Sequence, residues 1–148
     1  MIADLEKQDP PVVLVADMEA GLEHLSWAGG TLRHVDLLLV VLHPQAKVLL
    51  TARRTVRLAR QLGIPIVAFV ANRIRSGMAG DEDRARLVAF AAEHGGEVLA
   101  WIPEDDALVE ADRLGQCPLD CVPDSPGVAA IVGLAGALEE RFLVTAPA

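Results

Sequence analysis

Four short apolar runs of strand length alternate along the chain with longer stretches of helical spacing. The runs cover residues 12–16, 37–42, 65–71 and 97–102. Such unbroken runs are typical of parallel strands buried on both faces, because one-sided strands alternate apolar and polar positions. Strands that alternate with helices favour βαβ units with right-handed crossovers. We therefore predict an α/β domain with a mainly parallel sheet of about four strands and helices on both faces.

Start and stop signals bound the predicted helices. Gly63 follows the first helix as a stop, and Asp105 or Asp106 is the expected N-cap of the third. Ser125 is the expected N-cap of the last helix, with Pro126 at its first position. The four helices are expected over residues 46–62, 81–94, 107–114 and 126–142.

Length and composition indicate one compact domain spanning residues 1–148. The hydrophobic fraction of 52% and charged fraction of 23% argue against disorder. No apolar stretch approaches the roughly 20 residues that a transmembrane helix needs, and the start of the chain lacks an apolar signal core. Two cysteines do not make a disulfide framework. We therefore expect a cytoplasmic protein that does not enter membranes.

The net charge of −8 disfavours non-specific binding to nucleic acid or anionic membranes. The charge is uneven, because residues 37–80 contain no Asp or Glu and seven Lys or Arg. Arg53, Arg57 and Arg60 recur at i, i+4 and i+7 and form a basic strip on the first predicted helix. The strip is either an ordinary solvated face or a docking surface for an acidic partner or an opposing subunit.

Candidate chemistry is sought at the carboxyl ends of the strands, where open α/β sheets bind ligands. Asp17 follows the first apolar run, and an acid there can hold Mg²⁺ through its water shell. Gly21, four residues later, allows a backbone N–H to approach a terminal phosphate closely. The alternative for this pair is a helix N-cap followed by a turn glycine.

Two further strand ends carry candidate binding residues. Asn72 and Arg73 follow the third apolar run, and the side-chain amide of Asn72 suits the edge of a purine. Asn at a strand end is also a common turn residue. Pro103 follows the fourth run, where it fixes the chain direction and leaves neighbouring backbone groups free to face a ligand. The acids at 104–106 are explained equally well as helix caps.

Together these segments resemble a known family. Residues 12–25 are similar to the switch II segment of MinD/ParA-type ATPases, and most similar to the branch of carbon monoxide dehydrogenase maturation (nickel-insertion) ATPases. That branch has a characteristic D-x-E-A-G-x-E-H pattern, which here begins at Asp17 and ends at His24. Residues 36–44, 66–74, 101–115 and 123–138 resemble later segments of the family in the same order. The resemblance covers nearly the whole chain and corresponds to the family's C-terminal part.

The resemblance implies a role for each candidate. Asp17 would contact Mg²⁺ through water, and Gly21 would approach the γ-phosphate. Asn72 and Arg73 would lie in the adenine-binding segment, and Pro103 would flank the base. The implied ligands are ATP or ADP with Mg²⁺, and the implied partner is a second copy of the chain or another protein.

The chain also departs from the family. The family's Lys-Gly-Gly-x-Gly-Lys-[Ser/Thr] phosphate loop is absent, since Lys7 and Lys47 are the only lysines and neither lies in a glycine-rich loop. The branch's Cys-x-Cys metal site is absent too, and we interpret Cys117 and Cys121 as ordinary thiols rather than metal ligands. Phosphoryl transfer depends on positioning and neutralising phosphate, so we assign no catalytic residue and expect negligible hydrolysis by the chain alone.

The sequence thus leaves two functions open. The first is a nucleotide-binding component similar to metallocentre-maturation ATPases, which needs a P-loop from elsewhere; the second is a non-enzymatic interaction module. In the family the P-loop strand lies between the strands equivalent to residues 12–16 and 37–42. Without it, a partner chain fills the gap, the gene starts further upstream, or the two strands pair directly. We expect direct pairing in the isolated chain.

Overall fold

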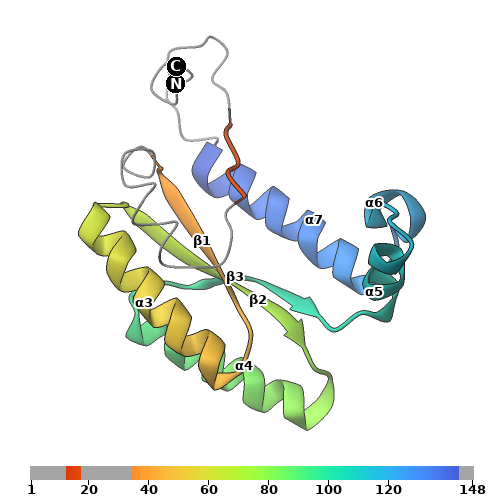
Figure 1. Cartoon of the computed structure of the whole chain (residues 1–148), viewed down its shortest axis with the longest axis horizontal. Helices are drawn as coiled ribbons and strands as arrows, with labels where there is room; N and C mark the ends of the chain where they lie inside the picture. Colours follow the sequence, from red (N-terminus) through yellow and green to blue (C-terminus); the bar gives the residue numbers. More distant parts are fainter. Residues whose placement is uncertain (1–12, 18–34, 144–148) are drawn as a thin grey trace.

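The computed structural model describes residues 13–17 and 35–143. Its three described strands form one parallel sheet in the order β1-β2-β3, which confirms the α/β fold class (Figure 1). None of the helices in the described ranges is long and apolar enough to cross a bilayer. The elements, in chain order, are β1 (Leu37–Leu42), α3 (Ala46–Leu62), β2 (Ile66–Ile74), α4 (Gly77–Glu93), β3 (Val98–Pro103), α5 (Asp106–Arg113), α6 (Pro118–Cys121), α7 (Pro126–Leu138) and the π-helical turn η3 (Glu139–Leu143).

Helices α3 and α4 cover one face of the sheet and enclose the main core. Leu42 of β1, Phe69 of β2 and Leu87 of α4 are fully buried there, beside Val56 of α3. Phe69 and Phe90 pack edge to face, with ring centroids 5.7 Å apart. This face is therefore packed as a conventional α/β core.

The opposite face is covered by α7, which packs mainly on β3. Its smaller core consists of Val70, Ala100 and Ile102, with Ala130 and Leu134 of α7 packed against them. Helices thus lie on both faces, as predicted, but the two faces are not covered equally.

Several local predictions are confirmed. Strand β1 and helix α3 have the predicted bounds, and Gly63 ends α3 in the left-handed conformation with φ 79°. Asp105 is the N-cap of α5 and accepts a hydrogen bond from the Ala107 amide. Ser125 caps α7 by accepting a hydrogen bond of 3.2 Å from the amide of Val128.

Other boundaries differ from the predictions. Helix α4 begins at Gly77 instead of residue 81, with Ser76 in the N-cap position. Strand β2 continues to Ile74 instead of ending at residue 71, because it keeps pairing with β3 through an irregularity. The short helix α6 was not predicted. Helix α7 ends at Leu138 and is followed by the π-helical turn, where one helix to residue 142 was expected.

The predicted strand at residues 12–16 is wrong for the part that the structure describes. Residues 13–17 form no strand, and β1 pairs only with β2 among the described residues, so the predicted direct pairing is also wrong. Val13, Leu14 and Val15 are 58%, 52% and 85% exposed. Residues 13–17 pair with none of the described strands, so no sheet ladder satisfies their backbone groups.

Candidate functional site

A bulge near the carboxyl end of β2 shapes the candidate site. Ala71 lies opposite Trp101 of β3 and Ile74 lies opposite Pro103, so Asn72 and Arg73 together face a single residue of β3. Arg73 has a φ of 56°, in the left-handed region that residues other than glycine rarely adopt. Strain of this kind costs roughly 1–3 kcal/mol and concentrates at functional sites.

The bulge fixes the Asn72 side chain. Its Oδ1 accepts a hydrogen bond of 2.9 Å from the backbone N–H of Arg73. A carbonyl oxygen has two lone pairs, so one acceptor position and the NH₂ donors remain chemically suited to a base edge. Asn72 is half-buried, whereas the side chain of Arg73 is exposed.

The loop that follows β3 lies beside the bulge. Pro103 is paired with Ile74, and the Glu104 amide donates a 3.0 Å hydrogen bond to the Ile74 carbonyl. The structure therefore brings Asn72, Arg73 and Pro103 together at the carboxyl ends of neighbouring strands.

Asp105 ties this loop to two helices. Its Oδ1 accepts from the Ala107 amide at 2.9 Å and its Oδ2 accepts from the Gly127 amide, in the first turn of α7, at 2.8 Å. The hydrogen bond from Gly127, followed by that from Ala107, lowers the pKa of Asp105. A Cβ on Gly127 would lie 2.4 Å from Leu108 Cδ1 and 2.9 Å from Asp105 Oδ2, so a larger residue would have to displace these side chains. The acid is thus a helix cap that also anchors the loop.

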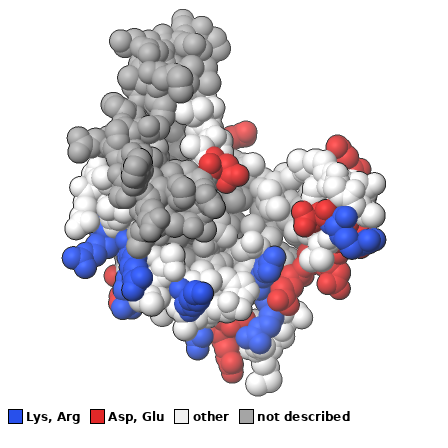
Figure 2. Space-filling model, in the orientation of Figure 1, with Lys and Arg blue, Asp and Glu red and all other residues white. Residues whose placement is uncertain are grey.

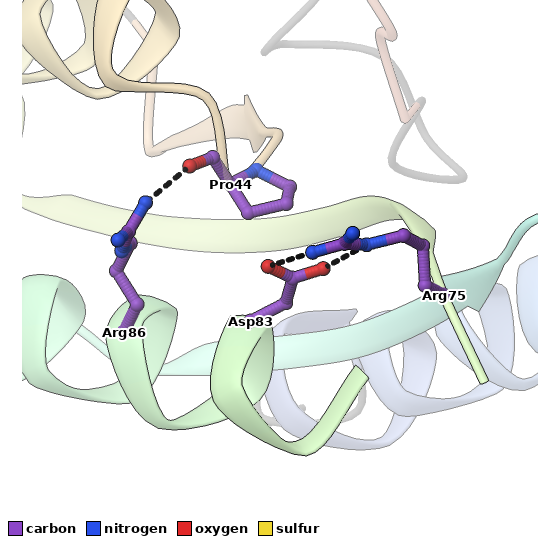
Figure 3. A network of polar contacts seen from close by, with 4 residues as sticks. All are labelled: Pro44, Arg75, Asp83 and Arg86. Carbon is purple, nitrogen blue, oxygen red and sulfur yellow. Dashed lines mark hydrogen bonds and ion pairs between the residues drawn. The ribbon is translucent and has the colours of Figure 1, made fainter. Parts of the chain in front are cut away.

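A second polar cluster joins the carboxyl ends of β1 and β2 to α4 (Figure 3). The Asp83 carboxylate, 8% exposed, accepts from Arg75 Nε at 2.9 Å and from Arg75 Nη2 at 3.0 Å. These hydrogen bonds lower the pKa of Asp83. Arg86, one turn further along α4, donates to the Pro44 carbonyl at 3.2 Å. Sequence reasoning missed this cluster, because the helix predicted over residues 81–94 places Asp83 in its first turn.

Asp17 does not join these residues. It is exposed in the segment 13–17, which Figure 1 draws in red, well away from the carboxyl ends of β2 and β3. Gly21 lies outside the described residues. The structure therefore brings together the three residues predicted for the base side, and the metal side stays a prediction.

The remaining sequence candidates have other surroundings. Arg53 pairs with Glu93 at 3.4 Å, and Arg60 donates to the carbonyl of His94, so two members of the basic strip link α3 to α4. Cys117 and Cys121 are both exposed thiols. Figure 2 shows basic side chains gathered toward the α3–α4 side of the molecule. The strip therefore has a structural use that neither predicted interpretation included.

A shallow groove of about 290 Å³ lies at the opposite end of the sheet. Residues at the amino ends of β2 and β3, including Ile66 and Glu97, line it together with Arg141 and Phe142. It shares no residue with the candidate site.

Comparison with known proteins supports an ATP-binding relationship. No protein family definition matches the chain. It is 38% identical over 111 residues to an uncharacterized ATP-binding protein of Methanocaldococcus jannaschii, covering 74% of this chain and 40% of that protein. It is 36% identical over 113 residues to the carbon monoxide dehydrogenase accessory protein CooC of Rhodospirillum rubrum, covering 76% of this chain and 39% of CooC.

Solved structures show the same fold. The MinD cell division protein of Aquifex aeolicus matches with a TM-score of 0.62 at 21% identity, covering 74% of this chain and 46% of MinD. The cell division ATPase MinD of Pyrococcus furiosus matches with a TM-score of 0.58 at 23% identity, covering 85% of this chain and 49% of that ATPase.

The chain spans about two fifths of the length of the curated relatives, 40% and 39%. This partial coverage fits the C-terminal portion that the sequence resembles. The chain is therefore a homologue of part of the ATP-binding proteins that include CooC, and it has the fold of the corresponding part of MinD-type P-loop ATPases.

Proposed function

We propose that this chain supplies the base-binding side of an ATP site and hydrolyses ATP only when a P-loop is supplied from elsewhere. The observation that supports this most is the bulge at Asn72 and Arg73, which lies beside Pro103 at the carboxyl ends of β2 and β3. The sequence, in contrast, contains no glycine-rich loop with a lysine. In this proposal the P-loop comes from upstream sequence or from a separate polypeptide.

Each residue has a chemical task in the proposal. The Asn72 amide reads the edge of adenine, with its orientation fixed by the hydrogen bond to the Arg73 amide. Arg73 presents an exposed guanidinium that stacks on the base. Pro103 holds the next loop in place, and Asp105 anchors that loop to α5 and α7. ATP or ADP is the proposed ligand.

No group of three or more His, Cys, Asp or Glu side chains that could hold a metal ion lies within residues 13–17 and 35–143. Mg²⁺ is commonly bound by one or two carboxylates together with the phosphates of its substrate. Water-mediated contact of Asp17 with Mg²⁺, and approach of Gly21 to phosphate, therefore stay predictions for an assembled site. No step of the proposal depends on the metal.

The relatives suggest the biological setting. Two similar proteins are ATP-binding proteins or accessory proteins of carbon monoxide dehydrogenase, so we propose that the assembled site serves metallocentre maturation. A homodimer or a complex with another protein is the proposed working state.

Nucleotide-dependent stabilisation tests the proposal. A ligand at 100 times its Kd stabilises the folded state by about 2.7 kcal/mol, which raises Tm measurably. Because the chain has no phosphate cradle, adenosine and ATP should shift its Tm by similar amounts. The Asn72→Ala variant should lose the shift, whereas Gln61→Ala, an exposed amide on α3, should keep it. Equal shifts in both variants would contradict the role of Asn72.

Hydrolysis offers a second test. The chain alone should show no Mg²⁺-dependent turnover, since it lacks most of the groups that position phosphate. Turnover above about 1 s⁻¹, the low end of the usual enzyme range, would overturn the proposal.

The alternative function is a non-enzymatic interaction module. It is favoured by the exposed apolar residues of α7. An absence of any nucleotide effect on Tm at millimolar ATP, with and without a P-loop-bearing partner, would select this alternative.

A further inference from the structure

The bulge near the carboxyl end of β2 is strained and has to be held by its surroundings. Arg73 adopts a φ of 56°, and backbone strain of this kind persists only where neighbouring structure fixes the chain. The hydrogen bond within the bulge, from the Arg73 amide to Asn72 Oδ1, is exposed to solvent. Such a bond contributes at most about as much as the strain costs, so a further contact must hold the bulge.

An ion pair fixes the chain two residues after the bulge. Arg75 Nε donates to Asp83 Oδ2 at 2.9 Å, and Arg75 Nη2 donates to Asp83 Oδ1 at 3.0 Å (Figure 3). Two parallel hydrogen bonds from a planar guanidinium fix direction as well as distance. Asp83 is the only buried charged residue in the described ranges, and a buried carboxylate is tolerated only when it is paired. We call this pair the Arg75–Asp83 clamp.

Helix α4, which carries the carboxylate of the clamp, is itself held against its neighbours. A Cβ built on Gly80 would lie 1.9 Å from the Arg75 carbonyl oxygen, so the first turn of α4 packs directly on the Arg75 backbone. Arg86 donates to the carbonyl of Pro44, just beyond β1, at 3.2 Å. The clamp therefore ties the chain after the bulge to a helix that cannot shift freely.

The sheet fixes the two ends of the bulge and leaves its interior undetermined. Ala71 lies opposite Trp101 and Ile74 lies opposite Pro103, so the register requires one extra residue in β2. The register does not require a particular backbone conformation for that residue, since bulges occur in several forms. The direction in which the chain leaves the bulge distinguishes these forms.

We propose that Arg75 and Asp83 are positioning residues for the base-binding side, because the clamp directs the chain after the bulge and so keeps the Asn72 side chain turned toward the Arg73 amide. With Oδ1 held in this way, the NH₂ group of Asn72 is oriented to donate to an acceptor on the edge of adenine. Both clamp residues act through Asn72, and neither contacts the base. This inference rests on the proposed function and adds two residues to it.

A purely structural clamp is the competing interpretation. In that case the pair only joins α4 to the sheet, and its loss lowers the stability of the whole fold without altering Asn72 in the molecules that stay folded. The Arg53–Glu93 pair provides the comparison. It also reaches α4, but at the end of the helix opposite the clamp, and its side chains are 58% and 62% exposed.

Adenosine binding to the full chain, measured by titration calorimetry, tests the positioning role. Asp83→Asn should weaken binding about tenfold, because the neutral amide no longer holds both guanidinium donors. Arg75→Lys keeps the charge and loses the planar fork, so it should weaken binding about fivefold. Glu93→Gln and Arg53→Lys make the same changes in the exposed pair, and their binding should stay within about twofold of wild type.

Hydrogen exchange separates positioning from stability. In Asp83→Asn the Arg73 amide should exchange as fast as it does in Asn72→Ala, which lacks the acceptor of that amide. Amides of α3 should stay protected in both variants, because they report the stability of the fold and not the bulge. A purely structural clamp would instead leave the Arg73 amide as it is in wild type.

Each outcome decides between the interpretations. Wild-type adenosine binding with an unchanged Arg73 amide in both clamp variants overturns the inference and leaves the proposed function standing. If Asp83→Asn does not fold, Arg75→Lys decides by the same two measurements, because it leaves the carboxylate a charged partner and Arg75 is 52% exposed. If wild type binds no adenosine, the proposed function fails. Fast exchange at Arg73 in the variants then still supports the hold of the clamp on the bulge, and unchanged exchange overturns it.

Discussion

Both faces of the sheet present apolar side chains, but these side chains are buried to different extents. On the α3–α4 face, Leu42, Phe69 and Leu87 are fully buried. On the α7 face, Val41 and Val132 remain more than half exposed, at 58% and 54%. The strands are apolar on both sides, as befits a sheet covered twice. Among the described residues one face is therefore closely packed and the other is not, and we propose that a partner covers the second.

The largest expected effect is on the face of the sheet that α3 and α4 cover. Phe69→Ala should destabilise the chain by about 3–5 kcal/mol, since it removes a buried ring from the core. Ile131→Ala on α7, where the side chain is 43% exposed, should cost less than about 1 kcal/mol. Urea denaturation measures both. Similar losses would show that the α7 face is as complete as the other.

The second effect concerns the contact between α7 and the candidate site. Gly127→Ala should destabilise by about 1–3 kcal/mol, because the new methyl would lie 2.4 Å from Leu108 Cδ1 and 2.9 Å from Asp105 Oδ2. Gly133→Ala in the same helix meets open space and should stabilise by up to about 1 kcal/mol. Thermal unfolding of the two variants checks the contrast. A stable Gly127→Ala variant would refute the close approach.

The third prediction concerns how folding stability depends on pH through Asp83. The pKa of Asp83 is lowered by its hydrogen bonds with Arg75, so the folded state holds its proton less tightly than the unfolded state. Its contribution is therefore present above the unfolded pKa of about 3.9 and is lost as pH falls through the lower folded pKa. Wild type should lose more stability than Asp83→Asn during acidification below about pH 5. Parallel pH profiles would contradict this.

The smallest effect concerns the bulge. Arg73→Gly should stabilise the chain by up to about 1 kcal/mol, because glycine adopts the φ of 56° without strain. Arg57→Gly in helix α3 is the control and should destabilise by about 1 kcal/mol. Chemical denaturation measures whether each variant gains or loses free energy of unfolding. A loss of stability in both would show that Arg73 is not strained.

Sequence patterns correctly predicted helix and strand bounds that depend only on residues close together in the chain. The apolar run of β1 and the stop at Gly63 gave correct bounds for β1 and α3. The start of α4 was missed because the acids at 81–83 resemble a helix start, whereas Asp83 is used to pair with Arg75 across the turn. The strand at residues 12–16 failed because a strand requires a neighbour, and apolar composition alone does not supply one.

In the candidate site, too, some features were predictable from the sequence and others depend on how distant segments pack. Inspecting the strand ends grouped Asn72 with Pro103, and the register of β2 with β3 places both at the same edge of the sheet. The bulge that orients Asn72 depends on the register between β2 and β3, and the Arg75–Asp83 pair depends on how α4 packs. Neither can be inferred from residue spacing.

Hydrogen exchange at the β1 amides tests most directly whether the chain is one side of a divided site. The measurement compares the chain alone with the chain bound to a polypeptide that supplies the P-loop. Alternate amides of β1 should exchange quickly in the free chain and become strongly protected in the complex, while amides of α4 change little. Equal exchange at β1 in a complex that has formed would contradict the proposal that the chain is one side of a divided site.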